Sequence, residues 1–269
     1  MKQKLLTLTL ASVMLAGGAS VAAAEIVNSL APKDTNFTWA DQSSGGGSAQ
    51  IVDLTGQGGD LENNAPAGKG ALALSTGGSG DDRGEVRYTG NFGTIGDFLQ
   101  SGSMSYNYYH NSGAPLTSIV PAIKFEVWDF TDNNSDPYAT FVYEPVYNAG
   151  GVGAFDSWHE VNIDGNTGDF WHTTLYDMNG ALYDNSIADW AAAYSSFSDA
   201  IITSIILGVG SGTPNQSGYV DDVYFRNGDI ELAADFEVSA VPLPAALPLY
   251  GAGMAILGFL GWRKKRKLA

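Results

Sequence analysis

Carboxylates are the commonest side chains in this sequence that could do chemistry, and several stand in close pairs. The pairs are Asp81 with Asp82, Asp129 with Asp132, and Asp221 with Asp222. A glycosidase needs two carboxyl groups held roughly 5–10 Å apart across a cleft. In a chain with 29 Asp and Glu such pairs also arise by chance, and no flanking motif marks an acid or a nucleophile. We therefore predict no catalytic residues and keep a secreted glycan-active hydrolase as an alternative.

Other kinds of catalytic site have no matching motif. His110, His159 and His172 are scattered, without an H-E-x-x-H pair, and no Ser stands in a G-x-S-x-G turn. The chain has no Cys, which excludes thiolate zinc sites and Cys nucleophiles.

Tryptophans on the polar side of predicted strands are candidates for sugar binding. In the alternating segment 122–130, Lys124, Glu126 and Trp128 share one side, opposite Phe125. Trp158 has the same parity as Glu160 within its own strand. An aromatic ring can stack on a sugar while nearby polar groups bind its hydroxyls; the alternative is that these rings are buried in the core. Extracellular polysaccharide is thus a candidate partner, with Trp128, Lys124, Glu126 and Trp158 as candidate contacts.

Oxygen ligands gather in the segment that follows this strand. Calcium prefers carboxylate and amide oxygens, although loops rich in Asp and Asn are often ordinary turns. One of Asp221 and Asp222 should also point inward, where a buried carboxylate needs a partner. No cofactor is established, and Ca²⁺ is a candidate whose ligands would come from Asp129, Asp132, Asn134, Asp136 and Asp222.

Short alternating runs separated by Gly, Asn, Asp and Ser predict strands along most of the chain. One amphipathic helix is expected from Ile187 to about Tyr194, with Ser186 as its N-cap. Ile201 to Val209 is a continuous apolar run, typical of a buried central strand. We predict an all-β fold, an antiparallel jelly-roll β-sandwich with one short helix, over residues 25–238. The other expected strands lie at 37–40, 49–54, 71–75, 85–88, 103–109, 122–130, 138–143, 157–163, 170–175 and 218–226, and residues 230–238 are expected to be a terminal strand or a linker.

A local resemblance supports this fold. The segment LGVGSG, a polar loop and then YVDDVYF resemble the closing strands of jelly-roll carbohydrate-binding modules and of concanavalin-like or laminin-G-like sandwiches. The resemblance implies a fold and assigns no function.

Both ends of the chain predict export. Residues 1–24 resemble a signal peptide, with Lys2 and Lys4, an apolar stretch and an A-x-A cleavage site. Seven of the 13 Lys and Arg lie in the terminal segments, while all 29 Asp and Glu lie between them. The middle therefore carries six basic residues and a net charge of −23, which excludes nucleic acid as a partner.

The C-terminal segment, 239–269, has three parts. Val241-Pro242-Leu243-Pro244 is a stiff, extended opener. Residues 245–262 form an uncharged run of 18 residues, which as a helix would be roughly 27 Å long, against about 30 Å for the hydrocarbon core of a bilayer. The basic cluster Arg263-Lys264-Lys265-Arg266-Lys267 would stay on the cytoplasmic side.

This three-part order resembles a PEP-CTERM sorting signal of the VPLPA variety. The resemblance implies an exosortase as a partner, transient anchoring in the membrane, and a final place at the cell surface or in the extracellular matrix. The function predicted is that of a non-enzymatic protein of the surface or exopolysaccharide matrix, binding glycan or calcium. A glycan-active hydrolase and a purely structural matrix protein remain the alternatives.

Overall fold

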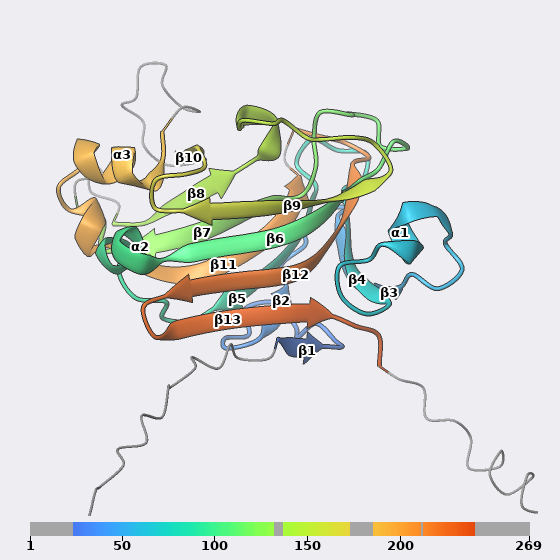
Figure 1. The fold of residues 1–269 in the computed structure, drawn as a ribbon, viewed down its shortest axis with the longest axis horizontal. Coiled ribbons are helices and arrows are strands. Elements are labelled where there is room, and N and C mark those ends of the chain that lie inside the picture. The colour runs from blue at the N-terminus through green and yellow to red at the C-terminus, as the bar shows by residue number, and fades with distance from the viewer. Residues whose placement is uncertain (1–23, 132–136, 173–184, 211, 240–269) are drawn as a thin grey trace, which may run out of the picture.

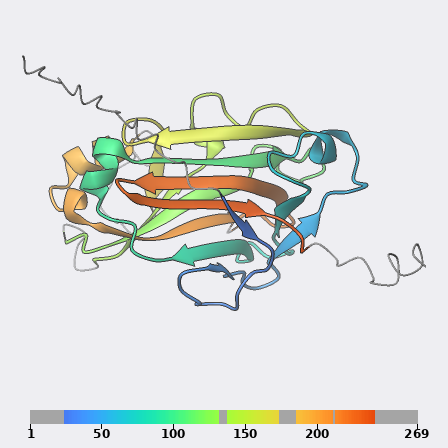
Figure 2. The ribbon, with the colours of Figure 1, turned by 60° about the horizontal axis from the view of Figure 1, so that its bottom comes forward.

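Two β-sheets packed face to face make up most of the described part of the chain, as the alternating sequence pattern predicts (Figures 1 and 2). The computed structural model describes residues 24–131, 137–172, 185–210 and 212–239. The predicted signal peptide, the sorting motif Val241–Pro244 and the basic cluster lie outside these residues. Within the described residues no helix is long and apolar enough to cross a bilayer.

The seven-stranded sheet is built around its longest strand, β12. On one side β12 pairs with β6, which pairs with β9. On the other side its first half pairs with β4 and its second half with β13. The short β1 pairs in parallel with β13, while the other strand pairs of this sheet in the described residues are antiparallel. The strands are β1 (Glu25–Val27), β3 (Ser48–Asp53), β4 (Gly70–Ser75), β6 (Ser103–His110), β9 (Ser157–Asp164), β12 (Ser217–Asn227) and β13 (Ile230–Phe236).

The six-stranded sheet has the order β10-β8-β7-β11-β5-β2. The apolar strand β11 lies between β7 and β5, which confirms its predicted central place. The strands are β2 (Trp39–Asp41), β5 (Arg83–Thr89), β7 (Ala122–Trp128), β8 (Ala139–Tyr143), β10 (Phe170–His172) and β11 (Ile201–Gly210).

Aromatic rings fill much of the space between the sheets. Phe125 stacks on Phe141 with ring centroids 5.2 Å apart and meets Phe170 edge-on at 5.4 Å. Trp39 packs edge-on against Phe236 of the opposite sheet. Such pairs stabilise a core beyond the area they bury.

Within residues 24–239, the described parts hold three short α-helices that flank the sandwich, where one was predicted. The predicted helix is confirmed as α3 (Ile187–Ala193): the Ser186 hydroxyl accepts from the Asp189 amide, and the Asp189 carboxylate accepts from the Ser186 amide. The prediction missed α2 (Ile95–Ser101), which has the same kind of capping box at Thr94 and Asp97, and α1 (Gly59–Asn63). α2 and α3 cover one end of the sandwich and α1 lies at the other (Figure 1).

Candidate functional site

The outward side of the six-stranded sheet carries an ordered set of polar and charged residues. Strand register places them in rows that cross the sheet. One row holds Arg87, Ile206, Lys124 and Val142, and Trp171 of β10 continues it beside Val142. The neighbouring row toward the end of β7 holds Ser204, Glu126 and Thr140.

Two ion pairs cross β11 side by side on this face. Lys124 Nζ lies 2.6 Å from Glu85 Oε2, and Arg87 Nη2 lies 3.0 Å from Glu126 Oε1. Glu126 also accepts hydrogen bonds from the hydroxyls of Tyr138 and Ser204. With three donors around one largely buried carboxylate, the row is fixed in position. Burial, and then the bond to Glu126, raises the pKa of Tyr138 to about 12, so its hydroxyl keeps its proton.

Aromatic groups lie beside these pairs. Trp171 is half-buried, and its indole Nε1 donates to Glu144 at 2.9 Å. Burial raises the pKa of Glu144, while the bond from Trp171 and the charge of Lys124 oppose that rise. Tyr147 ends the short 3₁₀ helix η1 (Pro145–Tyr147) and is 42% exposed.

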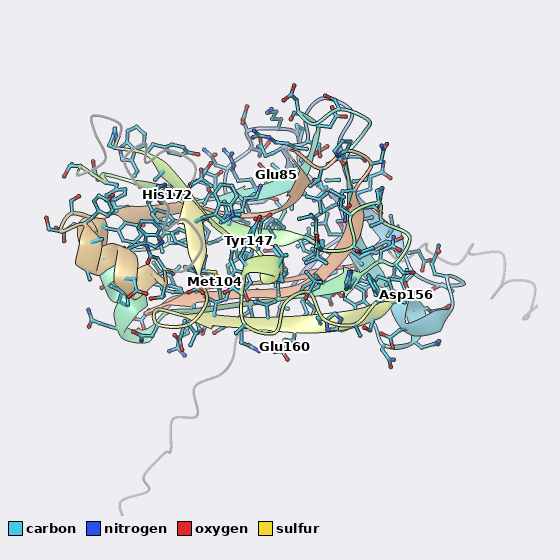
Figure 3. All side chains as sticks on the ribbon, turned by 90° about the horizontal axis from the view of Figure 1, so that it is seen from above. Glu85, Met104, Tyr147, Asp156, Glu160 and His172 are labelled. Atoms are coloured by element: carbon cyan, nitrogen blue, oxygen red, sulfur yellow. The ribbon has the colours of Figure 1, made fainter. Side chains whose placement is uncertain are left out.

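Together these groups form a hollow of about 560 Å³, called the groove below. Its floor comes from β5, β11, β7 and β8, and loop residues such as Ile119 and Thr213 close one end. Figure 3 shows Glu85, in the groove, on the opposite side of the sandwich from Glu160 of β9. The charged and aromatic residues that line it are Arg83, Glu85, Arg87, Lys124, Glu126, Tyr138, Glu144, Tyr147 and Trp171.

The structure brings together three of the four predicted glycan contacts. Lys124 and Glu126 line the groove. Trp128 ends β7 on the same side, two residues beyond Glu126, and is 50% exposed. Phe125 is fully buried, which confirms the predicted alternation of this strand. This face has a hollow and aromatic groups, whereas a purely structural role would be favoured by a flat surface without aromatic groups.

Trp158 lies apart from that group. It is on β9 of the seven-stranded sheet, opposite Tyr109 of β6. Its indole donates to the Leu61 carbonyl at 3.3 Å, and its amide donates to Asp60 at 3.1 Å, so it holds α1 against the sheet. Trp158 and Lys124 were both candidate contacts, but parity within a strand does not identify the sheet, and the structure places them on different sheets.

The predicted calcium ligands are not gathered in the described residues. Asp129 follows β7 with a positive φ of 65°, and Asp132, Asn134 and Asp136 lie outside the described residues. Asp222 is exposed on the far sheet, where it accepts from Asn107 at 3.3 Å. No group of three or more His, Cys, Asp or Glu able to hold a metal occurs in the described parts of the chain.

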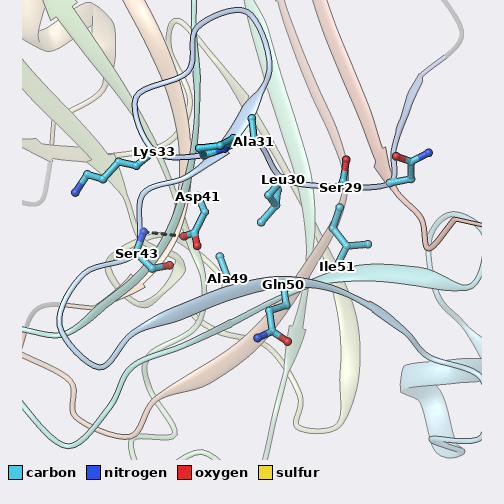
Figure 4. A pocket seen from close by; sticks show the side chains of 11 residues that line it. Ser29, Leu30, Ala31, Lys33, Asp41, Ser43, Ala49, Gln50 and Ile51 are labelled. Carbon is cyan, nitrogen blue, oxygen red and sulfur yellow. Dashed lines mark hydrogen bonds between the residues drawn. The ribbon is translucent and has the colours of Figure 1, made fainter.

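A second hollow, of about 660 Å³, lies between the N-terminal segment and β3 (Figure 4). Lys33 and Asp41 are its charged residues, and it has no aromatic lining. Asp41 already accepts from the Ser43 amide at 2.9 Å. This hollow therefore offers fewer recognition groups than the groove.

Sequence reasoning predicted Lys124 and Glu126 and missed the other charged and aromatic residues of the groove. Arg83, Glu85 and Arg87 alternate along β5, and that alternation was a usable signal that they share one side. Glu144 and Tyr147 follow β8 within four residues of its end, and Trp171 is the outward residue of a three-residue strand. No sequence pattern marks Glu144, Tyr147 or Trp171 as part of a binding site.

Comparisons with known proteins show similarity of fold at low scores. No protein-family model and no curated protein matches the sequence. A putative sugar-binding protein from Bacteroides thetaiotaomicron has a TM-score of 0.40 and 12% identity, over 76% of this chain and 95% of that one. A family 11 carbohydrate-binding module from Clostridium thermocellum, solved with a β-1,3-1,4-mixed-linked tetrasaccharide, has a TM-score of 0.38 and 14% identity, over 74% and 90%.

An enzyme is similar to the same degree. The endo-β-1,4-glucuronan lyase from Trichoderma reesei has a TM-score of 0.38 and 14% identity, over 72% of this chain and 92% of that one. Binding modules and an enzyme thus appear at equal scores, and no ligand or activity is carried over to this chain from them.

Proposed function

We propose that this chain is an exported, non-enzymatic protein that binds glycan through the groove on its six-stranded sheet. The observation that carries the proposal is the placement of Trp171 and Tyr147 beside two fixed ion pairs, Lys124–Glu85 and Arg87–Glu126. Sugars offer weakly apolar ring faces together with many hydroxyls. A groove that combines aromatic surface with closely set donors and acceptors suits both properties.

The rigidity of the groove favours binding. Its polar groups lie on paired strands or directly beside them and hold one another, so little side-chain freedom is lost when a ligand binds. Trp128 extends the same face beyond Glu126. A ligand that contacts both Trp171 and Trp128 would be an oligosaccharide or a longer chain, since β8 lies between their strands and Trp128 is four residues beyond Lys124, which shares the row of Trp171.

The test compares Trp171, which lines the groove, with Trp158, a predicted contact that lies on the other sheet. Residues 25–239 would be titrated by calorimetry with soluble dextran, xyloglucan and mixed-linkage β-glucan. We expect Trp171→Ala to weaken binding at least tenfold, about 1.4 kcal/mol, because it removes groove surface. Trp158→Ala is the matched control on the other sheet and should bind as wild type.

Loss of binding in Trp158→Ala with full binding in Trp171→Ala would move the site to the seven-stranded sheet. Absence of binding to every glycan tested would overturn the proposal and leave a purely structural matrix role. Thermal melting of each variant checks that it is folded.

A hydrolase remains the second candidate, because Glu85, Glu126 and Glu144 all line one groove. In such an enzyme a carboxyl of raised pKa, as at Glu144, would act as the acid opposite an ionised carboxylate. Incubation of the same glycans with the protein should release no reducing ends. If reducing ends are released by wild type but not by Glu144→Gln, the protein is an enzyme.

We further propose that the C-terminal segment, with Val241–Pro244 and Arg263–Lys267, is a sorting signal for an exosortase. Its support is the three-part order of the sequence. The processed protein would then be at the cell surface or in the extracellular matrix, where polysaccharide is available.

A further inference from the structure

Half of the basic residues between the two terminal segments line the groove. They are Arg83, Arg87 and Lys124, out of six. Three glutamates face them there, so the formal charges of the groove balance. The rest of the same stretch has three basic residues against 26 acidic ones. The groove is thus an electrically neutral site in a strongly acidic molecule.

The two central cations are already engaged. Lys124 and Arg87 each hold a glutamate at 3.0 Å or less, and the side chains of both glutamates are 10% exposed or less. A ligand carboxylate that approached Lys124 would also approach Glu85, and one that approached Arg87 would meet Glu126. The repulsion between like charges offsets the attraction, and the cation cannot be taken without leaving a glutamate unpaired.

Hydroxyl groups fit the same pairs without that conflict. Each ion pair presents a donor beside an acceptor, and a hydroxyl can donate and accept at once. Neighbouring hydroxyls of one sugar can therefore bind to the cation and to the carboxylate of one pair. The ion pairs are therefore part of the binding surface, and they also determine whether the groove binds a charged or an uncharged ligand.

Small residues leave space for a ring between the charged groups. Gly208 of β11 lies beside Glu85, and Ala122 of β7 is its neighbour on the other side. Tyr143 of β8 pairs with Ile123 of β7, so Glu144, the next residue after Tyr143, lies beside Ala122. Three strand spacings, about 14 Å between Cα atoms, then separate Glu85 from Glu144. A Cβ on Gly208 would approach Glu85 Oε2 to 3.3 Å, so glycine keeps this floor open.

We propose that the groove selects uncharged glycans, and that the ion pairs Lys124–Glu85 and Arg87–Glu126 impose the selection. This inference rests on the proposed glycan-binding function. Arg83 differs from the other two cations, since it is exposed at the end of the groove and no carboxylate pairs with it among the described residues. The acidic surface around the groove opposes the approach of a polyanion to that end.

The experiment measures a change of ligand class. Affinity electrophoresis at low salt would compare the three neutral glycans with alginate and polygalacturonate. Wild type should bind a neutral glycan and neither uronate polymer. Glu85→Gln frees Lys124, so neutral binding should fall about tenfold and uronate binding should appear, weakening as salt is added. Glu160→Gln makes the same charge change on the opposite side of the sandwich and should leave both unchanged (Figure 3).

Lys124→Gln is the second variant, and it should lose neutral binding without gaining uronate binding. Melting curves establish that both variants are folded. If wild type binds uronate polymers and Trp171→Ala abolishes that binding, the groove does not select uncharged glycans, although the glycan-binding function stands. A folded Glu85→Gln protein that gains no uronate binding, or a Glu160→Gln protein that gains as much, would also overturn it. Failure of wild type to bind any of the five polymers would overturn both proposals.

Discussion

The Asp221 carboxyl is fully buried in the seven-stranded sheet, where β12 passes from pairing with β4 to pairing with β13. Oδ1 accepts from the Phe236 amide at 3.0 Å, while Oδ2 is buried without a partner in the described structure. The register of β12 shifts between Asp221 and Tyr224, and there Asp221 is buried while Asp222 is exposed, so one of the pair is buried as predicted. Burial raises the pKa of Asp221 to about 7, from an ordinary value of 3.8, against the opposing effect of its hydrogen bonds.

This pKa predicts that stability falls as pH rises from about 4 to about 7. The native state holds a proton over that range and the unfolded chain does not, so ionisation costs stability, on the order of 4 kcal/mol for the whole shift. Asp221→Asn should remove most of this slope in urea unfolding at pH 5 and pH 7.5. Asp229→Asn, in the exposed turn before β13, should keep it. A wild-type protein that is equally stable at both values would contradict the prediction.

Individual residues were predictable where strand parity decides their side. Phe125, Lys124 and Trp128 follow the alternation of one segment, and the structure places all three accordingly. Glu85 and Lys124 are 39 positions apart, and only the sheet order makes them partners. Parity cannot supply that order, so the ion pairs could not be foreseen.

At the scale of elements, β7 links the core to the groove. Phe125 points inward and stacks on Phe141, while Trp128 ends the strand half-exposed. Truncation of a buried Phe typically costs about 3–5 kcal/mol, and loss of an exposed side chain well under that. We expect Phe125→Ala to unfold far more easily than wild type in denaturant, and Trp128→Ala to lose less than about 1 kcal/mol.

The same pair of variants separates folding from binding. Trp128→Ala should stay folded and bind glycan more weakly, because its ring continues the outward face beyond Glu126. If Trp128→Ala unfolds as early as Phe125→Ala, its indole packs in the core and the binding face ends at Glu126.

The missed helix α2 shows what element prediction lacked. Thr94 and Asp97 form a capping box, and Ile95 and Phe98 are buried at helical spacing. This capping signal was present in the sequence. A helix of seven residues is too short, however, to be stable through helix propensity alone. Packing of Phe98 on Phe225, at 5.7 Å, supplies the stability that the local sequence does not.

At the scale of the whole molecule, the acidic and basic residues lie in different parts of the chain. The stretch between the terminal segments carries −23, whereas the last 29 residues have five basic groups and no acidic one. A basic cluster after an apolar run stays cytoplasmic, and an acidic domain suits the exterior. Sequence alone supports this division, since both terminal segments lie outside the described residues.

If the C-terminal segment is a sorting signal, the mature protein should end near Pro244. Cleavage there would remove the apolar run together with Arg263–Lys267 and release the sandwich from the membrane. Intact-mass measurement of the surface or secreted protein should give a chain without these residues. Replacement of Val241–Pro244 by four alanines should keep the full-length form in the membrane fraction, because the apolar run is roughly as long as a bilayer is thick. An intact basic cluster on mature surface protein would contradict processing, and the groove would then act while anchored at the membrane.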